Sequence, residues 1–332
     1  MKTLLLSKED VESILTMKGV MEAVKDGYCA FEEGGVQQPD IVSMEMPQAN
    51  GETDIKACYN EENKSISVKT ASGFFDNGKE NTLPTMIGVI QVFDGLTGAP
   101  LCIMDGSLIT GIRTGAAGAI SSELLAREEA HTVCVIGGGG QARMQIYGLC
   151  QVREIKTVKV FSPYPPELAQ YKKDVEVKTG AEVVICDTVE EAAKDADIII
   201  TTTPSKKFLL PADVVRPGTH IVAVGADMAG KNEIDPQIFA GAKVVNDNKA
   251  QCIGRGETRN AILAGVIKED DIYAEIGEIL TGKKLGRTDE AEITVFDTTG
   301  MAIQDNVTAM NVYLTAKEKG IGQYFEFLKG EA

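Results

Sequence analysis

The sequence predicts an α/β protein with two domains, in which a doubly wound parallel sheet is joined to a smaller α+β domain. Two patterns indicate this. From about residue 130 onward, short apolar runs alternate with helical stretches, which is typical of parallel strands linked by helices. The first 125 residues instead place closely spaced strand-like runs after an opening helix, which favours an antiparallel sheet. A chain of 332 residues is long enough for both domains.

The first part of the chain is predicted to begin with a helix over residues 8–33 that ends at Gly34-Gly35. Short strands follow over residues 40–46, 53–59, 65–71, 85–93 and 99–104. Asp94–Gly98 has the composition of a hairpin turn, so these strands are expected to form an antiparallel meander. Residues 114–121 are nearly all small and predict a helix that packs closely and bridges the domains.

The second part is predicted to alternate strand and helix. Strands are expected over residues 132–136, 156–161, 182–186, 197–202, 219–224, 242–246 and 293–296. Helices are expected over 140–151 and 165–178, the latter starting at Pro165 and Pro166. A last helix is expected from about Met301 to Lys319.

A glycine-rich turn follows the first of these parallel strands and is the most informative motif. Its spacing is G-x-G-x-x-A, and its members are Gly137, Gly139, Gly140, Gln141 and Ala142. The first glycine permits a tight turn, the second lets backbone approach a pyrophosphate, and the alanine allows helix and strand to pack closely. This context predicts a Rossmann-type dinucleotide site. The alternative is a glycine turn with a structural role alone.

Composition excludes several classes of function. The net charge of −16 and the pI near 4.7 argue against nucleic-acid binding. No apolar stretch approaches the ~20 residues that span a bilayer, and the N-terminal apolar run is too short for a signal peptide. We therefore expect a cytoplasmic protein without membrane contact.

Histidine and cysteine chemistry is not expected to carry the function. The two histidines, His131 and His220, each precede an apolar strand, so neither a histidine triad nor a metal site is predicted. The seven cysteines show no C-x-x-C pair and several lie in strand-like runs, which is typical of small buried side chains. Proton transfer is left to Lys, Asp, Glu, Tyr or water.

Three charged side chains are candidates for chemistry. Lys69 shares one strand face with Ser65 and Ser67, and it is either solvated or placed in a cleft to hold a carboxylate or transfer a proton. Arg113 is expected near a helix start, where it needs an anion, either a bound ligand or an ordinary ion-pair partner. Asp227 follows a parallel strand, where it can bind an amine, act as a base or open a turn.

Ser162 stands where a dinucleotide site usually places a ribose-binding carboxylate, at the end of the second parallel strand. Its presence removes repulsion against a 2′-phosphate, although no arginine is adjacent. The cofactor is therefore expected to be NAD or NADP, with NADP favoured. Thr203, after the strand over 197–202, is assigned to the same site.

Six short segments, taken in order, resemble the ornithine cyclodeaminase/mu-crystallin family over nearly the whole chain. They are Ser67–Lys69, Leu83–Thr85, Gly111–Ala117, Gly137–Ala142, Gly225–Asp227 with Gly230-Lys231, and Phe296–Gly300. The resemblance implies a Rossmann domain over 119–301, with a substrate and dimerisation domain formed from both chain ends, 1–118 and 302–332. It also implies a homodimer.

The resemblance also implies site residues. Lys69 and Arg113 would hold a substrate carboxylate, Lys69 would also be a candidate proton donor, and Asp227 would take the amine and act as acid or base. The cofactor would be lined by Thr85, Arg113, Thr114, Gly140, Gln141, Ser162, Lys231 and Thr298.

The chain departs from the family at two positions. Family members often carry an arginine or lysine just after an early proline, whereas here Pro39 is followed by Asp40. Lys56 lies in the next strand, where relatives often have methionine before Pro-Ala. Asp40 and Lys56 form either a salt bridge or a contact to a different end of the substrate.

The sequence therefore predicts an NAD(P)-dependent enzyme that transfers hydride at the amine or imine carbon of a small amino or imino acid. Cyclodeamination, imine reduction and amino-acid dehydrogenation all remain open, because they share that hydride step. The alternative class is a non-catalytic, mu-crystallin-like protein that binds a dinucleotide or another small ligand.

Overall fold

The computed structural model describes residues 2–80, 82–163 and 168–327. The chain divides into two compact units, Met1–Arg113 with Met301–Ala332 and Thr114–Gly300. The predicted α/β class, with one parallel sheet and one mainly antiparallel sheet, is confirmed. The expected helix start at Pro165 and Pro166 lies outside the described residues.

The sheet of the first unit contains both ends of the described chain. Its strands are β1 (Lys2–Leu6), β2 (Val36–Gln37), β3 (Val42–Met46), β4 (Gly51–Asn60), β5 (Ser65–Phe74), β6 (Met86–Asp94), β7 (Pro100–Asp105) and β16 (Gln323–Glu326). Strands β4 to β7 pair antiparallel in chain order, which confirms the meander. The sequence did not predict β1, parallel to β7, or β16, antiparallel to β1.

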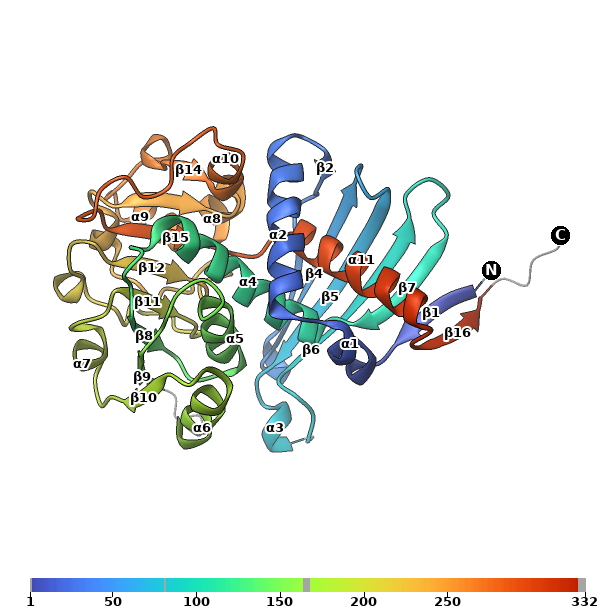
Figure 1. Cartoon of the computed structure of the whole chain (residues 1–332), viewed down its shortest axis with the longest axis horizontal. Helices are drawn as coiled ribbons and strands as arrows, with labels where there is room; N and C mark the ends of the chain where they lie inside the picture. Colours follow the sequence, from blue (N-terminus) through green and yellow to red (C-terminus); the bar gives the residue numbers. More distant parts are fainter. Residues whose placement is uncertain (1, 81, 164–167, 328–332) are drawn as a thin grey trace. The chain divides into compact units, whose positions relative to one another are not determined.

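Two helices, α2 (Met17–Glu32) and α11 (Ala302–Lys319), lie over one face of this sheet (Figure 1). The single helix predicted over 8–33 is wrong, because α1 (Lys8–Ile14) ends before extended backbone at Leu15. The Thr16 side chain then accepts a hydrogen bond from the Gly19 N–H and caps a new helix. The short helix α3 (Asn77–Glu80) precedes β6.

The covered face of the sheet is apolar at one end and polar at the other. Leu4, Ile90, Val92 and Met104 form a buried cluster with Val312 of α11. On β5, the residues that face inward are instead Ser65, Ser67 and Lys69, all buried. The opposite face of β5 carries apolar side chains that stay partly exposed. The unit therefore buries polar groups where α11 crosses β4 and β5.

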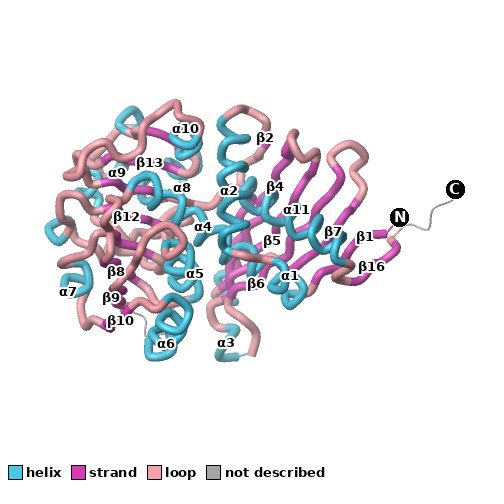
Figure 2. Tube along the Cα trace, in the orientation of Figure 1, coloured by secondary structure: helices cyan, strands magenta, loops and turns pink. Residues whose placement is uncertain are grey.

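The second unit is built on a parallel sheet, whose strands lie between helices (Figure 2). The strands run in the order β10 (Glu182–Ile185), β9 (Thr157–Phe161), β8 (Thr132–Ile136), β11 (Ile198–Thr201), β12 (His220–Ala223), β15 (Thr294–Asp297), β13 (Lys243–Asn246) and β14 (Ala274–Glu275). Each pair is parallel. The order reverses between β8 and β11, the usual place for a ligand in such sheets.

Helices cover both faces of the parallel sheet. They are α5 (Gly140–Leu149) and α6 (Leu168–Thr179) on one side, and α7 (Val189–Ala193) and α9 (Glu257–Leu263) on the other (Figure 1). Helices α8 (Lys249–Arg255) and α10 (Ile276–Leu280) complete the unit. No helix in the described ranges is long and apolar enough to cross a membrane.

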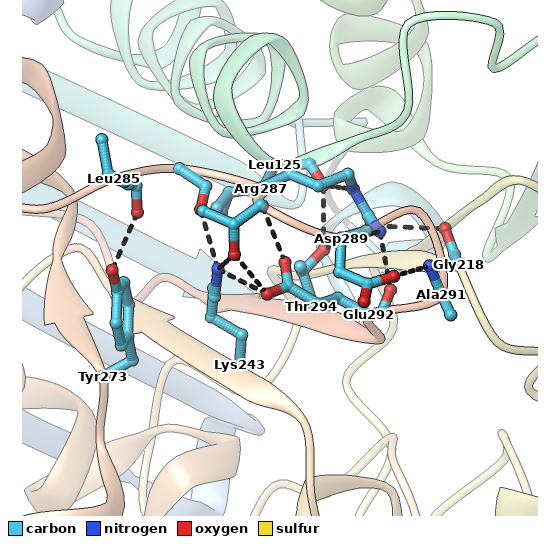
Figure 3. Close-up of polar contacts among 12 residues, drawn as sticks. Leu125, Gly218, Lys243, Tyr273, Leu285, Arg287, Asp289, Ala291, Glu292 and Thr294 are labelled. Carbon is cyan, nitrogen blue, oxygen red and sulfur yellow. Dashed lines mark hydrogen bonds and ion pairs between the residues drawn. The ribbon is translucent and has the colours of Figure 1, made fainter.

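Helix α4 (Ser107–Leu125) contains the division between the units, at Arg113/Thr114. Its small residues allow close packing as predicted, because a Cβ at Gly115 would lie only 2.4 Å from the Met144 carbonyl oxygen of α5. Figure 3 shows Arg287 at its other end. Arg287 Nε donates to the Leu125 carbonyl at 2.7 Å and Nη2 donates to the Gly218 carbonyl at 3.2 Å. A cation there satisfies the carbonyl of Leu125, the last residue of α4, which has no partner within the helix.

Candidate functional site: a dinucleotide cradle and a buried cation pair

The glycine turn after β8 leaves open space where a phosphate would lie. Gly137 has φ +108°, and a Cβ there would lie 2.6 Å from Thr202 Oγ1, so only glycine fits. A Cβ at Gly139 or Gly140 would meet nothing within 4 Å. Ala142 is fully buried. The turn therefore combines a tight bend at Gly137 with an uncrowded backbone at the next glycines.

The start of α5 offers hydrogen-bond donors at this turn. Gly139 is the N-cap and no side chain caps the helix, so the first backbone N–H groups are available to an anion. Among the described residues, the buried Gln141 Nε2 has no hydrogen-bond partner. Open backbone and an unsatisfied donor fit the pyrophosphate of a dinucleotide.

Other predicted cofactor residues lie at the carboxyl ends of the same parallel strands. Thr203 Cγ2 would lie 3.1 Å from a Cβ at Gly137, so the structure brings these two residues together. The Thr203 N–H donates to the buried Glu233 at 2.5 Å. Thr298 follows β15, and its Oγ1 donates to Asp247 at 2.6 Å. Ser162 directly follows β9 and is half-buried.

Asp227 and Lys231 form an ion pair within one loop after β12. Lys231 Nζ lies 2.7 Å from Asp227 Oδ1, and the Asp227 side chain is 48% exposed. Arg255 Nε of α8 donates to the Asp227 carbonyl oxygen at 2.9 Å, and Asn260 Nδ2 of α9 donates to the Lys231 carbonyl oxygen at 2.8 Å. The loop backbone is therefore held from two helices, and the Asp227 carboxylate is accessible.

Two further predicted cofactor residues, Thr114 and Thr85, belong to different units of the structure. Thr114 of α4 is buried, and its carbonyl oxygen accepts a hydrogen bond from Gln145 Nε2 at 2.9 Å. Thr85 belongs to the first unit, where it is exposed just before β6.

Lys69 and Arg113 are brought together by a carboxylate that the sequence did not single out. Lys69 Nζ lies 2.7 Å from Asp305 Oδ2, and Arg113 Nε donates to Asp305 Oδ1 at 3.0 Å. All three side chains are at most 5% exposed. The solvated alternative for Lys69 is therefore wrong: α11 covers the polar face of β5.

Arg113 does not lie at a helix start, contrary to the expectation. Helix α4 begins at Ser107, six residues earlier, so Arg113 lies in its second turn. Its Nη1 donates to Gln304 Oε1 at 3.2 Å, and Gln304 Nε2 donates to the Tyr28 hydroxyl at 2.8 Å. Buried partners from α11 and α2 therefore orient the guanidinium.

Lys56 belongs to this cluster, whereas Asp40 is exposed. Lys56 lies directly opposite Lys69 in the β4–β5 register and is only 8% exposed. Asp40 lies between β2 and β3. The structure thus places a lysine from each of two neighbouring strands on the face that α11 covers.

Burial and neighbouring charges shift the pKa values of Lys69 and Asp305. Burial, together with repulsion from Arg113 and Lys56, lowers the pKa of Lys69 to about 7, although Asp305 opposes that shift. Burial opposes ionisation of Asp305, but Arg113 and Lys69 outweigh it and hold its pKa below the usual value. Lys69 can therefore gain or lose a proton near neutral pH.

Asp305 and Gln304 are the site residues that sequence reasoning missed. The available signal was the run Gln304-Asp305-Asn306 inside a helix whose following residues are small or apolar. All three side chains are buried. Three successive polar residues on a helix usually include a solvated one, so a fully buried run indicates polar partners on the facing sheet.

Comparison with known proteins identifies the family of the chain. The family model described as "Ornithine cyclodeaminase/mu-crystallin family" matches residues 1–320. The chain belongs to the ornithine cyclodeaminase/mu-crystallin family. The resemblance drawn from its six short segments is thereby confirmed.

Members of this family resemble the chain over nearly its whole length. The alanine dehydrogenase of Archaeoglobus fulgidus is 35% identical over 99% of this chain and 100% of its own. The structure of Thermococcus litoralis Δ1-pyrroline-2-carboxylate reductase with NADH and L-proline has a TM-score of 0.93 and 33% identity, covering 97% of this chain and 99% of its own. An archaeal alanine dehydrogenase dimer with bound NAD has a TM-score of 0.93 and 35% identity, covering 99% and 100%.

Proposed function

We propose that this protein is an NAD(P)-dependent enzyme that transfers hydride at the amine or imine carbon of a small amino or imino acid. The observation that carries the proposal is the buried pair of cations, Lys69 and Arg113, held by one carboxylate. Burying charge is costly unless it is compensated. Two buried cations, Lys69 and Arg113, that share a single carboxylate suit a second anion, the substrate carboxylate.

Both cations retain capacity to bind that carboxylate. Lys69 Nζ has three donors and contacts Asp305 and Thr110, the latter at 3.3 Å. Arg113 has five donors, and the contacts described above use two of them. With its pKa near 7, Lys69 can also deliver a proton to the substrate or take one from it.

The cradle at Gly137–Ala142 is proposed to hold the cofactor. Its open backbone and helix N-terminus suit the pyrophosphate, and Thr203 and Thr298 follow β11 and β15, the two strands that pair with β12. The nicotinamide supplies or accepts the hydride when it is bound. Ser162 leads us to propose that the protein also accepts NADP, whereas the structural relatives above were solved with NADH or NAD.

Asp227 is proposed to bind the substrate amine and to act as acid or base. Its carboxylate is accessible and its loop backbone is fixed, which suits a group that must meet a substrate in one geometry. The named relatives are a dehydrogenase and a reductase. We therefore favour dehydrogenation or imine reduction over cyclodeamination.

A substrate scan tests the proposal. Amino acids with NAD or NADP, and 2-oxo acids with amines and the reduced cofactors, are followed by the near-ultraviolet absorbance of the reduced nicotinamide. Lys69→Met and Asp227→Asn should each lower kcat by ~10²–10⁴-fold and leave cofactor affinity unchanged, since general acid–base catalysis contributes about that much. Lys317→Met, at an exposed lysine of α11, is the matched control and should keep full activity.

Binding without turnover is the outcome that contradicts the enzyme proposal. If the protein binds NADH by calorimetry and converts none of these substrates, it belongs to the non-catalytic class. Full activity of Lys69→Met would reject the assigned site and leave the reaction class intact.

We also propose that the protein is a homodimer through the sheet face opposite α11. Val89 on this face of β6 is 43% exposed and Ile87 is 41% exposed, and the half-buried Ile66 and Val68 of β5 point to the same face further along the pair. Contiguous exposed apolar patches mark interaction sites. The archaeal alanine dehydrogenase structure is a dimer, which supports a second copy as the partner.

A further inference from the structure

Asp305 lies where α11 meets β5 and α4. It belongs to the first turn of α11 and is 1% exposed. One oxygen lies 2.7 Å from Lys69 Nζ, and the other accepts the Arg113 Nε hydrogen bond at 3.0 Å. A single carboxylate thus fixes the distance between two cations that come from different elements.

Strands β4 and β5 and helix α4 supply the charged groups around this carboxylate, and α2 supplies the Tyr28 hydroxyl, which accepts a hydrogen bond from the neighbouring Gln304. Strand β4 supplies Lys56 and Cys58, and burial followed by the Asp305 charge raises the pKa of Cys58 to about 12, so Cys58 stays a neutral thiol. Strand β5 supplies Lys69, and α4 supplies Arg113. Cations from three elements therefore surround one buried carboxylate.

We infer that Asp305 is a positioning residue that holds Lys69 and Arg113 as one spaced pair of donors for the substrate carboxylate. The inference rests on the proposed function. Asp305 itself is not assigned a contact with substrate, because both of its oxygens are directed to the two cations. Its effect on the reaction passes through Lys69 and Arg113.

The physical reason is repulsion between neighbouring buried cations. Like charges repel more strongly in a protein interior than in water, so Lys69 and Arg113, which share Asp305, would separate or lose a proton without that counter-charge. Lysine can lose its proton, whereas arginine stays charged. Lys69, whose Nζ lies 2.7 Å from Asp305 Oδ2, is therefore the partner of Asp305 that can lose its proton when Asp305 is neutralised.

The direction of the response follows from the signs. Asp305 raises the pKa of Lys69, against burial, Arg113 and Lys56, which lower it to about 7. Removing the Asp305 charge therefore lowers this pKa further. The part of the activity that needs the Lys69 ammonium is present below that pKa and lost above it. The alkaline midpoint of the kcat profile therefore moves to lower pH.

Two substitutions separate charge from shape. Asp305→Asn removes the charge at nearly constant size, and we expect kcat to fall by ~10²-fold, the loss typical of a misplaced acid–base group, with the alkaline midpoint of the kcat profile lowered by about one pH unit or more. Asp305→Glu keeps the charge, so its midpoint should stay near that of the parent even if kcat falls. The matched control is Glu292→Gln, which removes a carboxylate 2.8 Å from Lys243 in the second unit.

The outcomes that overturn the inference are specific. Identical pH midpoints for the parent, Asp305→Asn and Asp305→Glu would reject it. If Asp305→Asn and Glu292→Gln lowered kcat by the same factor, the inference would also be rejected, because the fall in kcat would then reflect reduced stability alone.

A second measurement is independent of activity, so failure of the proposed function is distinguishable from failure of this inference. Unfolding in urea is followed for the parent, Lys69→Met, Asp305→Asn and the double variant. The folded Lys69 pKa near 7 lies below the unfolded value of 10.5, so the unfolded chain binds more protons between these limits. The parent should therefore gain stability relative to Lys69→Met as pH rises from 7, and the gain should begin at lower pH when Asp305 is Asn. Additive effects of the two substitutions at every pH would overturn the inference.

Discussion

At the scale of single residues, we propose that Ser162 sets the preference between the two dinucleotides. It directly follows β9, where a carboxylate would hydrogen-bond the ribose 2′-hydroxyl of NAD and repel a 2′-phosphate. Serine carries no charge that would repel a 2′-phosphate, and its hydroxyl can hydrogen-bond either group, so both cofactors should bind. The preference then depends on how much positive charge lies near the 2′ position.

Ser162→Asp should move the preference toward NAD. We expect the ratio of kcat/KM for NADH over NADPH to rise by about tenfold or more, because a hydrogen bond to a charged group contributes ~1.5–3 kcal/mol. Steady-state kinetics with both reduced cofactors measure the ratio. Strong rejection of NADPH by the parent protein would show that the NADP preference is wrong.

Residue patterns identified the cation pair only in part. The alternation in Ser65–Lys69 correctly placed Ser65, Ser67 and Lys69 on one face, but it could not say which face is buried. That depends on α11, more than 200 residues later in the chain, whose Asp305 partners Lys69. The periodicity of one strand does not indicate which distant helix packs on it, so Asp305 and Gln304 were not predicted as site residues.

At the scale of elements, β8, the glycine turn and α5 form a motif that is recognisable from the sequence alone. The required strand, turn and helix are contiguous, and each glycine has a separate steric reason. The break between α1 and α2 was harder to predict, since it depends on one capping side chain, Thr16, inside a continuous helical pattern.

Two glycine substitutions in this turn should have opposite effects. Gly139→Val adds a side chain in open space, so the protein should fold normally but bind NADH at least ~10²-fold more weakly, because the side chain enters the pyrophosphate position. Gly137→Ala forces a Cβ against Thr202 at positive φ, so it should lower stability by ~1–3 kcal/mol. Thermal unfolding and calorimetry with NADH distinguish the two. Unchanged NADH affinity in folded Gly139→Val would reject the cradle.

At the scale of the whole molecule, the family and the α/β class followed from the order of short motifs. The strands at the two chain ends did not, because β1 and β16 are short and pair only with each other and with β7. The domain boundaries of 118/119 and 301/302 remain a prediction. The compact units divide at 113/114 and 300/301.

Dimerisation is the prediction that belongs to this scale. Val89→Lys places a charge on the partly exposed apolar face of β6, and we expect it to convert a dimer into a monomer in light scattering after gel filtration, since burying an unpaired charge is costly. Val177→Lys, on α6 with 81% exposure, is the matched control and should stay dimeric. A parent protein that is monomeric at all concentrations would reject the proposed interface.

The pairing of Asp305 with Lys69 also has a consequence for synthesis. The residues of the second unit, 114–300, leave the ribosome before α11 does, and domains generally fold as units during translation. Lys69 and Arg113 are therefore synthesised before their shared carboxylate, which follows Arg113 by more than 190 residues. A nascent or truncated chain that stops before residue 305 contains all of the second unit, but it leaves the cation pair without Asp305. The first unit can therefore form this buried ion pair only after synthesis has passed into α11.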